Sequence, residues 1–169
     1  MEKNLTLTGM MGVGKTTIGK RLAKMLNYDF VDIDKIIEKK EAQSITSIFK
    51  NKGEDYFRKI ERDLTIIELK KKKIVISLGG GAILNSSIRK YVKKNSTSFW
   101  IDAPINTLLK RLKKSKNRPV LNKEKMSDSI KKIYFERKKF YNQANHKINC
   151  KKLTLKQIIE KILALYEKT

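Results

Sequence analysis

The chain has 169 residues, of which 40% are hydrophobic and 34% are charged, and its formal net charge is +23. This composition excludes a disordered chain, and the length excludes two catalytic domains of ordinary size, so we expect one globular domain. A single cysteine excludes an internal disulfide, and the lack of a signal pattern or of a run of about 20 apolar residues predicts a cytoplasmic protein with no membrane partner.

Short apolar segments alternate with helical patterns along the chain. Strands are predicted at Leu5 to Thr8, Phe30 to Ile33, Ile74 to Leu78, Phe99 to Ile101 and His146 to Asn149. The last helix is expected to begin at Thr154, because Gln157 three residues later completes a capping box. This alternation predicts an α/β three-layer sandwich around a central, mostly parallel five-stranded sheet.

Two segments interrupt the alternation. Ile45 to Ile67 has a helical pattern, which indicates a helical insertion after the second strand. Lys113 to Lys125 is polar and contains Arg118 and Pro119, which is typical of a mobile loop. An insertion and a loop beside one cleft suggest a substrate cap and a lid.

The first predicted strand leads into a phosphate-loop motif. Gly9 to Thr16 matches the pattern G-x-x-x-x-G-K-[ST], with a strand before it and a helix after it. The loop backbone, including Gly12, Val13 and Gly14, can direct N–H groups at phosphate oxygens at the start of a helix. Lys15 would reach the β- and γ-phosphates and Thr16 would ligate Mg²⁺, so the motif predicts ATP and Mg²⁺ as cofactors.

A pair of carboxylates follows the second predicted strand. On an extended segment Asp32 and Asp34 would face the same side and could both reach the cleft. There they would suit Mg²⁺ coordination through water and acceptance of a hydroxyl proton. The alternative is a helix-capping Asp34 with Asp32 on the surface.

Two further clusters follow in the chain. Arg58 and Glu61 lie one helical turn apart, so they form either part of a site or a surface salt bridge. Gly79, Gly80 and Gly81 end the third strand, where consecutive glycines suit a ligand that touches the backbone. A plain loop is the other interpretation of these glycines.

The ordered set of motifs resembles the shikimate kinase family from end to end. Besides the phosphate loop, the matching segments are Phe30 to Asp34 with Ile37-Glu38, Ser44 to Phe49, Gly53-Glu54, Phe57-Arg58 with Glu61, Gly79 to Ala82, Arg118 to Leu121, and Glu136 to Tyr141. The resemblance implies a P-loop fold like that of nucleoside-monophosphate kinases, and ATP-dependent phosphorylation of the 3-hydroxyl of shikimate. Gln43 and Ser47 depart from the family pattern, where a glycine and an acidic residue are usual.

The resemblance also implies roles for individual residues. Asp34 would bind the substrate hydroxyl and act as the base, with Asp32 supporting Mg²⁺ together with Thr16. The substrate carboxylate would be held by Arg58 and Arg137, and its ring would lie against Gly79, Gly80 and Gly81. The nucleotide would be bound by the loop residues Gly12 to Thr17, by Arg111 near adenine and by Arg118 from the lid.

The resemblance divides the domain into three parts. The core would comprise residues 1–33, 72–112 and 126–169, the substrate-binding helices residues 34–71, and the lid residues 113–125. A monomer without a nucleic-acid partner is expected. A same-fold kinase for gluconate or a nucleoside monophosphate is the nearest alternative, and a basic nucleic-acid-binding or regulatory P-loop protein is the alternative of a different class.

The positive charge has two explanations. Seven of the 40 basic residues are arginines, and the rest are lysines spread along the whole chain. Biased composition with solvated faces explains this pattern, and a functional basic surface is the alternative. Because lysine is the common choice here, a retained arginine indicates a position that needs a planar fork for carboxylate or phosphate.

Overall fold

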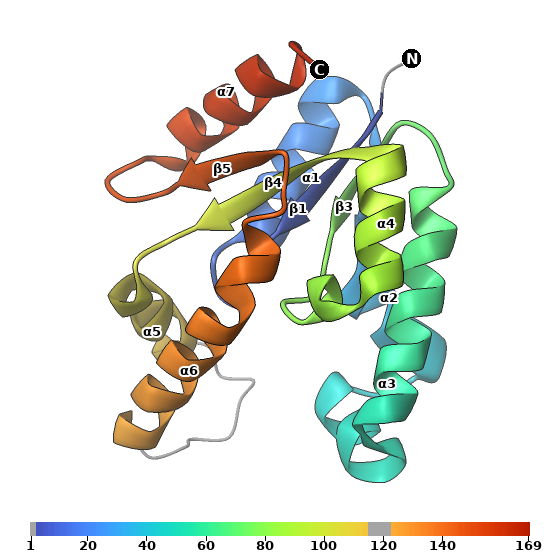
Figure 1. Ribbon diagram of the computed structural model, residues 1–169, viewed down its shortest axis with the longest axis vertical. Coiled ribbons are helices and arrows are strands. Elements are labelled where there is room, and N and C mark those ends of the chain that lie inside the picture. Colours follow the sequence, from blue (N-terminus) through green and yellow to red (C-terminus); the bar gives the residue numbers. More distant parts are fainter. Residues whose placement is uncertain (1–2, 115–122) are drawn as a thin grey trace.

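A parallel sheet of five strands forms the centre of the protein in the computed structural model (Figure 1). The structure describes residues 3–114 and 123–169, with side chains over residues 3–113 and 126–169. The strand order is β2-β3-β1-β4-β5, and each neighbouring pair is parallel. The strands are β1 (Asn4–Thr8), β2 (Asp29–Asp32), β3 (Ile74–Ser77), β4 (Ser96–Asp102) and β5 (His146–Asn149). The predicted fold class is confirmed.

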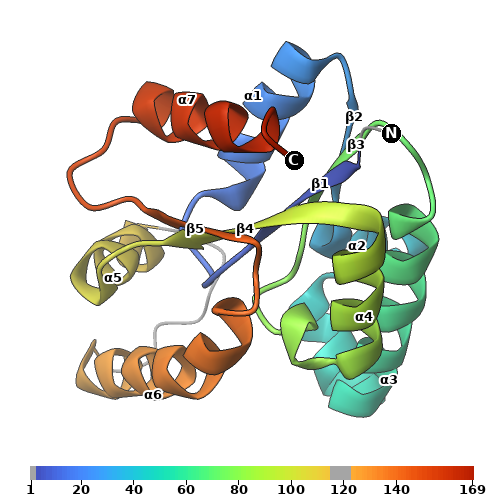
Figure 2. The same cartoon turned by 45° about the horizontal axis from the view of Figure 1, so that its top comes forward.

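Helices cover both faces of this sheet. Figure 2 shows α1 (Lys15–Leu26) and α7 (Leu155–Tyr166) on one face, and α3 (Ile45–Leu69), α4 (Ser86–Asn95) and α6 (Lys123–Tyr141) on the other. The remaining helices are α2 (Ile33–Glu41), the 3-10 turn η1 (Ala82–Leu84) and α5 (Ile105–Lys114). Among the described residues, no helix has both the length and the apolar character needed to cross a membrane.

The central strand β1 has two faces of different chemistry. Leu5 and Leu7 are fully buried, and Leu7 packs near Gly19 of α1. Thr6 and Thr8 alternate with them and are also buried, but the Thr6 hydroxyl donates to Ser96 Oγ at 2.8 Å on the α4 side. Strand β1 therefore presents apolar side chains toward α1 and hydroxyl groups toward α4.

The expected capping box is confirmed at the start of α7. The Thr154 hydroxyl accepts from the Gln157 backbone N–H at 3.3 Å, and Gln157 Oε1 accepts from the Thr154 backbone N–H at 2.9 Å. This reciprocal pair satisfies two donors that a helix N-terminus leaves without partners. It sets the start of the helix that covers α1.

The segment after β2 differs from the prediction. The expected strand Phe30 to Ile33 ends at Asp32, because the Asp32 carboxylate caps a new helix by accepting from the Lys35 N–H at 3.4 Å. Ile33 and Asp34 are therefore helical, and the two aspartates do not lie on one face of an extended segment. The cap is Asp32, not Asp34.

Other boundaries shift by a few residues. The predicted helical insertion is observed as α3, which is two residues longer and is kinked at Gly53, where φ is 82° and ψ is 170°. The fourth strand extends beyond Phe99 to Ile101 at both ends. Lys113 and Lys114 belong to α5 and Lys123 begins α6, so both described ends of the predicted loop are helical. The centre of that loop, with Arg118, lies outside the described residues.

Candidate active site

The phosphate loop joins β1 to α1 at the carboxyl edge of the sheet. Gly9, Gly12 and Gly14 have positive φ values of 139°, 75° and 103°. At Gly9 a Cβ atom would lie only 2.4 Å from the backbone oxygen of Ile101 in β4, so no side chain fits between the loop and the neighbouring strand. The motif glycines are thus required by the backbone path itself.

Lys15 and Thr16 begin α1 and point back toward the loop. Lys15 is 9% exposed, and its Nζ donates to the backbone oxygens of Gly9 at 2.8 Å and Met10 at 3.0 Å. The Thr16 hydroxyl donates to Asp32 Oδ2 at 2.6 Å. The ammonium group is thereby held inside the loop, at the positive end of α1, where a phosphate would bind.

Arg111 closes the loop from α5. Its Nη1 donates to the Val13 oxygen at 2.8 Å and to the Gly12 oxygen at 3.5 Å. A cavity of about 280 Å³ adjoins this contact and is lined by Thr17 and Arg111 together with apolar side chains from the β5–α7 region, namely Leu153, Leu155 and Ile158. These apolar residues were not predicted as site residues, because their local sequence does not distinguish them from ordinary core positions.

Asp32 and Asp34 serve two different parts of the site. Asp32 contacts Thr16 in the phosphate loop. Asp34 lies in the first turn of α2 and approaches the glycine loop Gly79–Gly81. A Cβ atom added at Gly79 would lie only 2.6 Å from Asp34 Oδ1. The capping turn at Asp32 directs the two carboxylates to separate places.

The glycine loop is surrounded by the predicted charged groups. A Cβ atom at Gly79 would also lie 2.7 Å from Glu61 Oε1, and one at Gly81 would lie 2.7 Å from both terminal nitrogens of Arg58. At Gly80 the Arg137 Nη1 would be 3.5 Å away, and the Met11 nitrogen of the phosphate loop 3.4 Å. The fold therefore brings Asp34, Arg58 and Arg137 together over these glycines and beside the phosphate loop.

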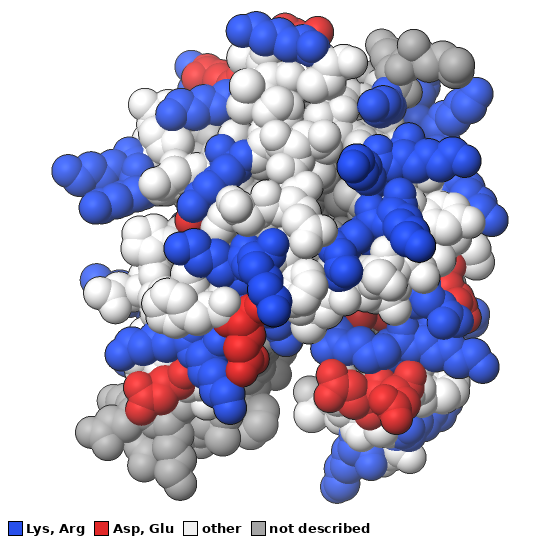
Figure 3. Space-filling model, in the orientation of Figure 1, with Lys and Arg blue, Asp and Glu red and all other residues white. Residues whose placement is uncertain are grey.

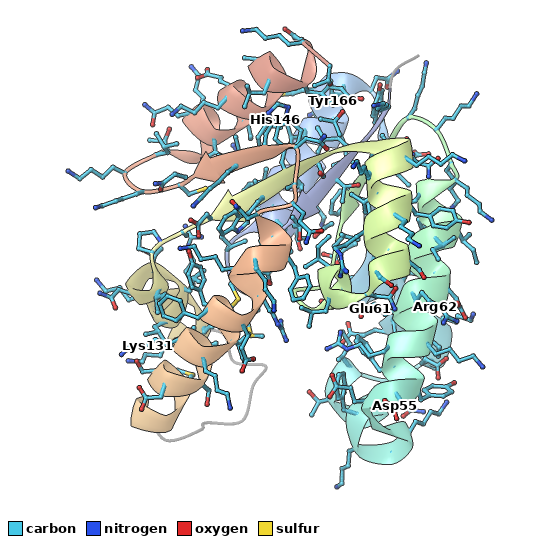
Figure 4. All side chains as sticks on the ribbon, in the orientation of Figure 1. Asp55, Glu61, Arg62, Lys131, His146 and Tyr166 are labelled. Carbon is cyan, nitrogen blue, oxygen red and sulfur yellow. The ribbon has the colours of Figure 1, made fainter. Side chains whose placement is uncertain are left out.

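Glu61 holds Arg58 in this arrangement. Arg58 Nη1 lies 2.7 Å from Glu61 Oε2, and its Nε and Nη2 each donate to Glu54 Oε1 at 3.1 Å. Figure 4 shows Glu61 on the inner side of α3 and its neighbour Arg62 on the outer side. Burial raises the pKa of Glu61, and the adjacent Arg58 charge opposes that rise. The alternative of a surface salt bridge is wrong, because Glu61 is 2% exposed.

Tyr141 also contacts the candidate site. The sequence indicated it only as the last residue of the segment Glu136 to Tyr141 that resembles the family. Its hydroxyl donates to the Gly80 oxygen at 2.5 Å and lies 3.7 Å from Met10 Sδ. Burial raises the pKa of this phenol, and Arg137 opposes the rise. Tyr141 thus ties the end of α6 to both loops, a contact that no local pattern could reveal.

The phosphate loop at the end of β1, in a parallel sheet with the order β2-β3-β1-β4-β5, defines a P-loop nucleotide-binding fold, and the acidic and arginine side chains beside it fit a phosphotransferase. A family model described as shikimate kinase matches residues 11–167. The chain belongs to the shikimate kinase family.

Individual relatives agree with this assignment. A shikimate kinase of Sulfurihydrogenibium sp. (strain YO3AOP1) is 45% identical over 161 residues, which cover 95% of this chain and 96% of the relative. The solved structure of a shikimate kinase from Acinetobacter baumannii in complex with shikimate has a TM-score of 0.91 and 32% identity, and the match covers 98% of this chain and 93% of that one. A gluconokinase from Sinorhizobium meliloti 1021, 13% identical with a TM-score of 0.65, shares the fold alone.

Proposed function

We propose that this chain transfers the γ-phosphoryl group of ATP to the 3-hydroxyl of shikimate and forms shikimate 3-phosphate. The observation that carries this proposal is the convergence of Asp34, Arg58 and Arg137 on the glycine loop, next to the phosphate loop. Two guanidinium groups suit a carboxylate, and a carboxylate suits a hydroxyl, so this set matches a small hydroxylated acid. The solved relative in complex with shikimate supports this substrate.

The nucleotide would be bound by the phosphate loop and α5. Backbone N–H groups of Gly12 to Thr17 would bind the phosphates, with Lys15 at the β- and γ-phosphates. The cavity beside Arg111 has apolar walls and one guanidinium, which suits a planar adenine ring. Arg118 would add positive charge at the transferred phosphoryl group, by resemblance to the family.

Mg²⁺ fits the oxygen groups at the end of β2. The Thr16 hydroxyl and the Asp32 carboxylate are hard oxygen ligands, and they lie 2.6 Å apart. Thr16 would hold the ion directly and Asp32 would support it. When bound, Mg²⁺ would neutralise charge on the β- and γ-phosphates.

Asp34 is the proposed proton acceptor. Its carboxylate lies beside Gly79, on the side proposed for shikimate, whereas Asp32 contacts Thr16 of the phosphate loop. Arg58 and Arg137 would orient shikimate through its carboxylate, so that the hydroxyl meets Asp34 and the phosphoryl group together. The chemistry then needs no covalent intermediate on the protein.

A coupled assay of ADP release tests the proposed function. The enzyme is supplied with ATP and Mg²⁺ and with shikimate, gluconate, AMP or no acceptor. We expect turnover that depends on shikimate. Turnover with gluconate or AMP instead would assign the chain to another kinase of the same fold, and release that needs no acceptor would overturn the proposal.

We also propose that the enzyme acts as a monomer in the cytoplasm, without a nucleic-acid or membrane partner. The groups assigned above to nucleotide, Mg²⁺ and shikimate converge within a single chain, so the proposed site needs no residue of a second copy. Light scattering of the purified chain, with and without ATP and shikimate, tests the oligomeric state.

A further inference from the structure

A second cavity, of about 480 Å³, lies on the α4 face of the sheet. It is bounded by α4 on one side and by the segment Gln143–Asn145, between α6 and β5, on the other. None of the residues assigned above to nucleotide, metal or shikimate lines it. Its volume is within the range of small-molecule sites in proteins.

The floor of this cavity carries hydroxyl groups from β1 and β4. Ser98 is satisfied, since its Oγ donates to Asn145 Oδ1 at 2.8 Å and accepts from the Asn145 N–H at 3.0 Å. Thr8 is 1% exposed, and its hydroxyl has no hydrogen-bond partner among the described residues. This hydroxyl oxygen is itself fully buried, so it lies beneath the floor and is not open to a ligand in the cavity.

The α4 wall is positively charged. Arg89, Lys90 and Lys93 line the cavity, and no acidic residue does. Arg89 and Lys93 are four residues apart and therefore lie on one side of the helix. Figure 3 shows lysine and arginine side chains gathered over α4. The cavity thus combines three cations with uncharged polar groups.

Arg89 is held in place by its own contacts. Its Nη1 donates to the oxygens of Ile83 at 2.9 Å and Leu84 at 2.7 Å, and its Cζ lies 4.9 Å from the ring centre of Phe140. In the part of the chain that the structure describes, its Nε and Nη2 donate no hydrogen bond. A guanidinium fixed in this way loses little freedom when it binds an anion.

We propose that this cavity binds a small anion with two acidic groups on a hydroxylated carbon chain, of the class of phosphorylated hydroxy acids. Arg89 would bind the phosphate through its remaining donors, and Lys93 would bind the second acidic group. The side-chain amides of Gln143 and Asn145, which line the cavity, would bind the hydroxyls of the ligand. Biased lysine composition alone does not explain an arginine that is fixed beside this cavity by two hydrogen bonds and an aromatic ring.

The test is a titration of the ¹⁵N-labelled chain with 3-phosphoglycerate, followed by amide chemical shifts. Because the probe can also enter the phosphate loop, the shifts must be assigned to residues. We expect saturable shifts at Arg89 to Lys93, Ser98 and Gln143 to Asn145. Lys93→Gln should raise the Kd obtained from these shifts by about tenfold, as expected for the loss of one charged hydrogen bond. Lys94→Gln is the matched control, since Lys94 is an exposed neighbour outside the cavity.

A second variant tests the segment between α6 and β5. Gln143→Ala removes an exposed amide that lines the cavity, so it should weaken binding there and should not lower the thermal midpoint of the unliganded protein. Shifts confined to Gly9 to Thr16, shifts that never saturate, or equal weakening by Lys93→Gln and Lys94→Gln would each overturn the proposal. In those cases the cavity holds solvent only.

Discussion

Arg58 Nη1 lies 2.7 Å from the carboxylate of Glu61, one turn further along α3, and Glu61 is 2% exposed. Burial raises the pKa of this carboxylate, the guanidinium of Arg58 opposes the rise, and the carboxylate fixes the guanidinium in return. Because both groups approach the glycine loop, the ion pair sets the position of a proposed shikimate ligand.

Glu61→Gln should raise the shikimate KM at neutral pH, because Arg58 loses its buried charged partner and is then held by the exposed Glu54 alone. In the parent enzyme the same loss should occur as the pH falls, since the pKa of Glu61 is raised above 4.5 and protonation therefore begins at a higher pH than usual. Shikimate KM measured between about pH 5 and 8 checks this. The rise toward low pH should be weaker in the Gln variant. Identical profiles for the two proteins would contradict the assigned role.

Arg58→Lys should raise the shikimate KM by roughly tenfold or more and leave the ATP KM nearly unchanged, because one ammonium group cannot replace a planar fork. Steady-state kinetics with each substrate varied in turn give the measurement. Arg62→Lys is the control on the same helix, since Arg62 pairs with Asp63 on the outer side of α3. Equal changes in both KM values would mean that Arg58 is structural.

The fold was largely predictable because its signals are local. The buried run Ile74 to Ser77, the phosphate loop after β1 and the capping box at Thr154 each lie within a few residues. The boundary at Ile33 was missed because the Asp32 carboxylate serves both as a helix cap and as the partner of Thr16. A strand pattern of four residues cannot reveal that Asp32 makes both contacts.

The residues of the candidate site were named from sequence motifs, and their roles remain proposals, but their positions relative to one another could not be predicted. Asp34, Glu61 and Gly79 are far apart in the chain and meet only because β2 and β3 are neighbours in the sheet. The bond from Tyr141 to the Gly80 oxygen likewise depends on how α6 packs. Such contacts follow from tertiary packing, which residue spacing does not encode.

Substitutions of Asp34 and Asp32 should change different steps of the reaction. Asp34→Asn keeps the size of the side chain and removes the proposed base, so kcat should fall by roughly 10² or more while binding of ATP with Mg²⁺ persists. Asp32→Asn should instead raise the Mg²⁺ concentration needed for half-maximal activity, because Asp32 contacts Thr16. Calorimetry with ATP and Mg²⁺ checks both variants. Loss of ATP binding in the Asp34 variant would reverse the assignment.

Gly9→Ala should destabilise the fold and weaken ATP binding together, since Gly9 has a φ of 139° and a Cβ atom there would lie 2.4 Å from the Ile101 oxygen. That oxygen belongs to buried strand β4, so the overlap is relieved only if the loop moves away from the strand. We expect a loss of about 3 kcal/mol and a fall in the thermal midpoint of roughly 6–12 °C. Gly80→Ala is the stability control, because its added Cβ would have no neighbour closer than 3.4 Å. Thermal unfolding by circular dichroism compares the two variants, and an equal midpoint in both would show that the close approach of Gly9 to β4 does not limit stability.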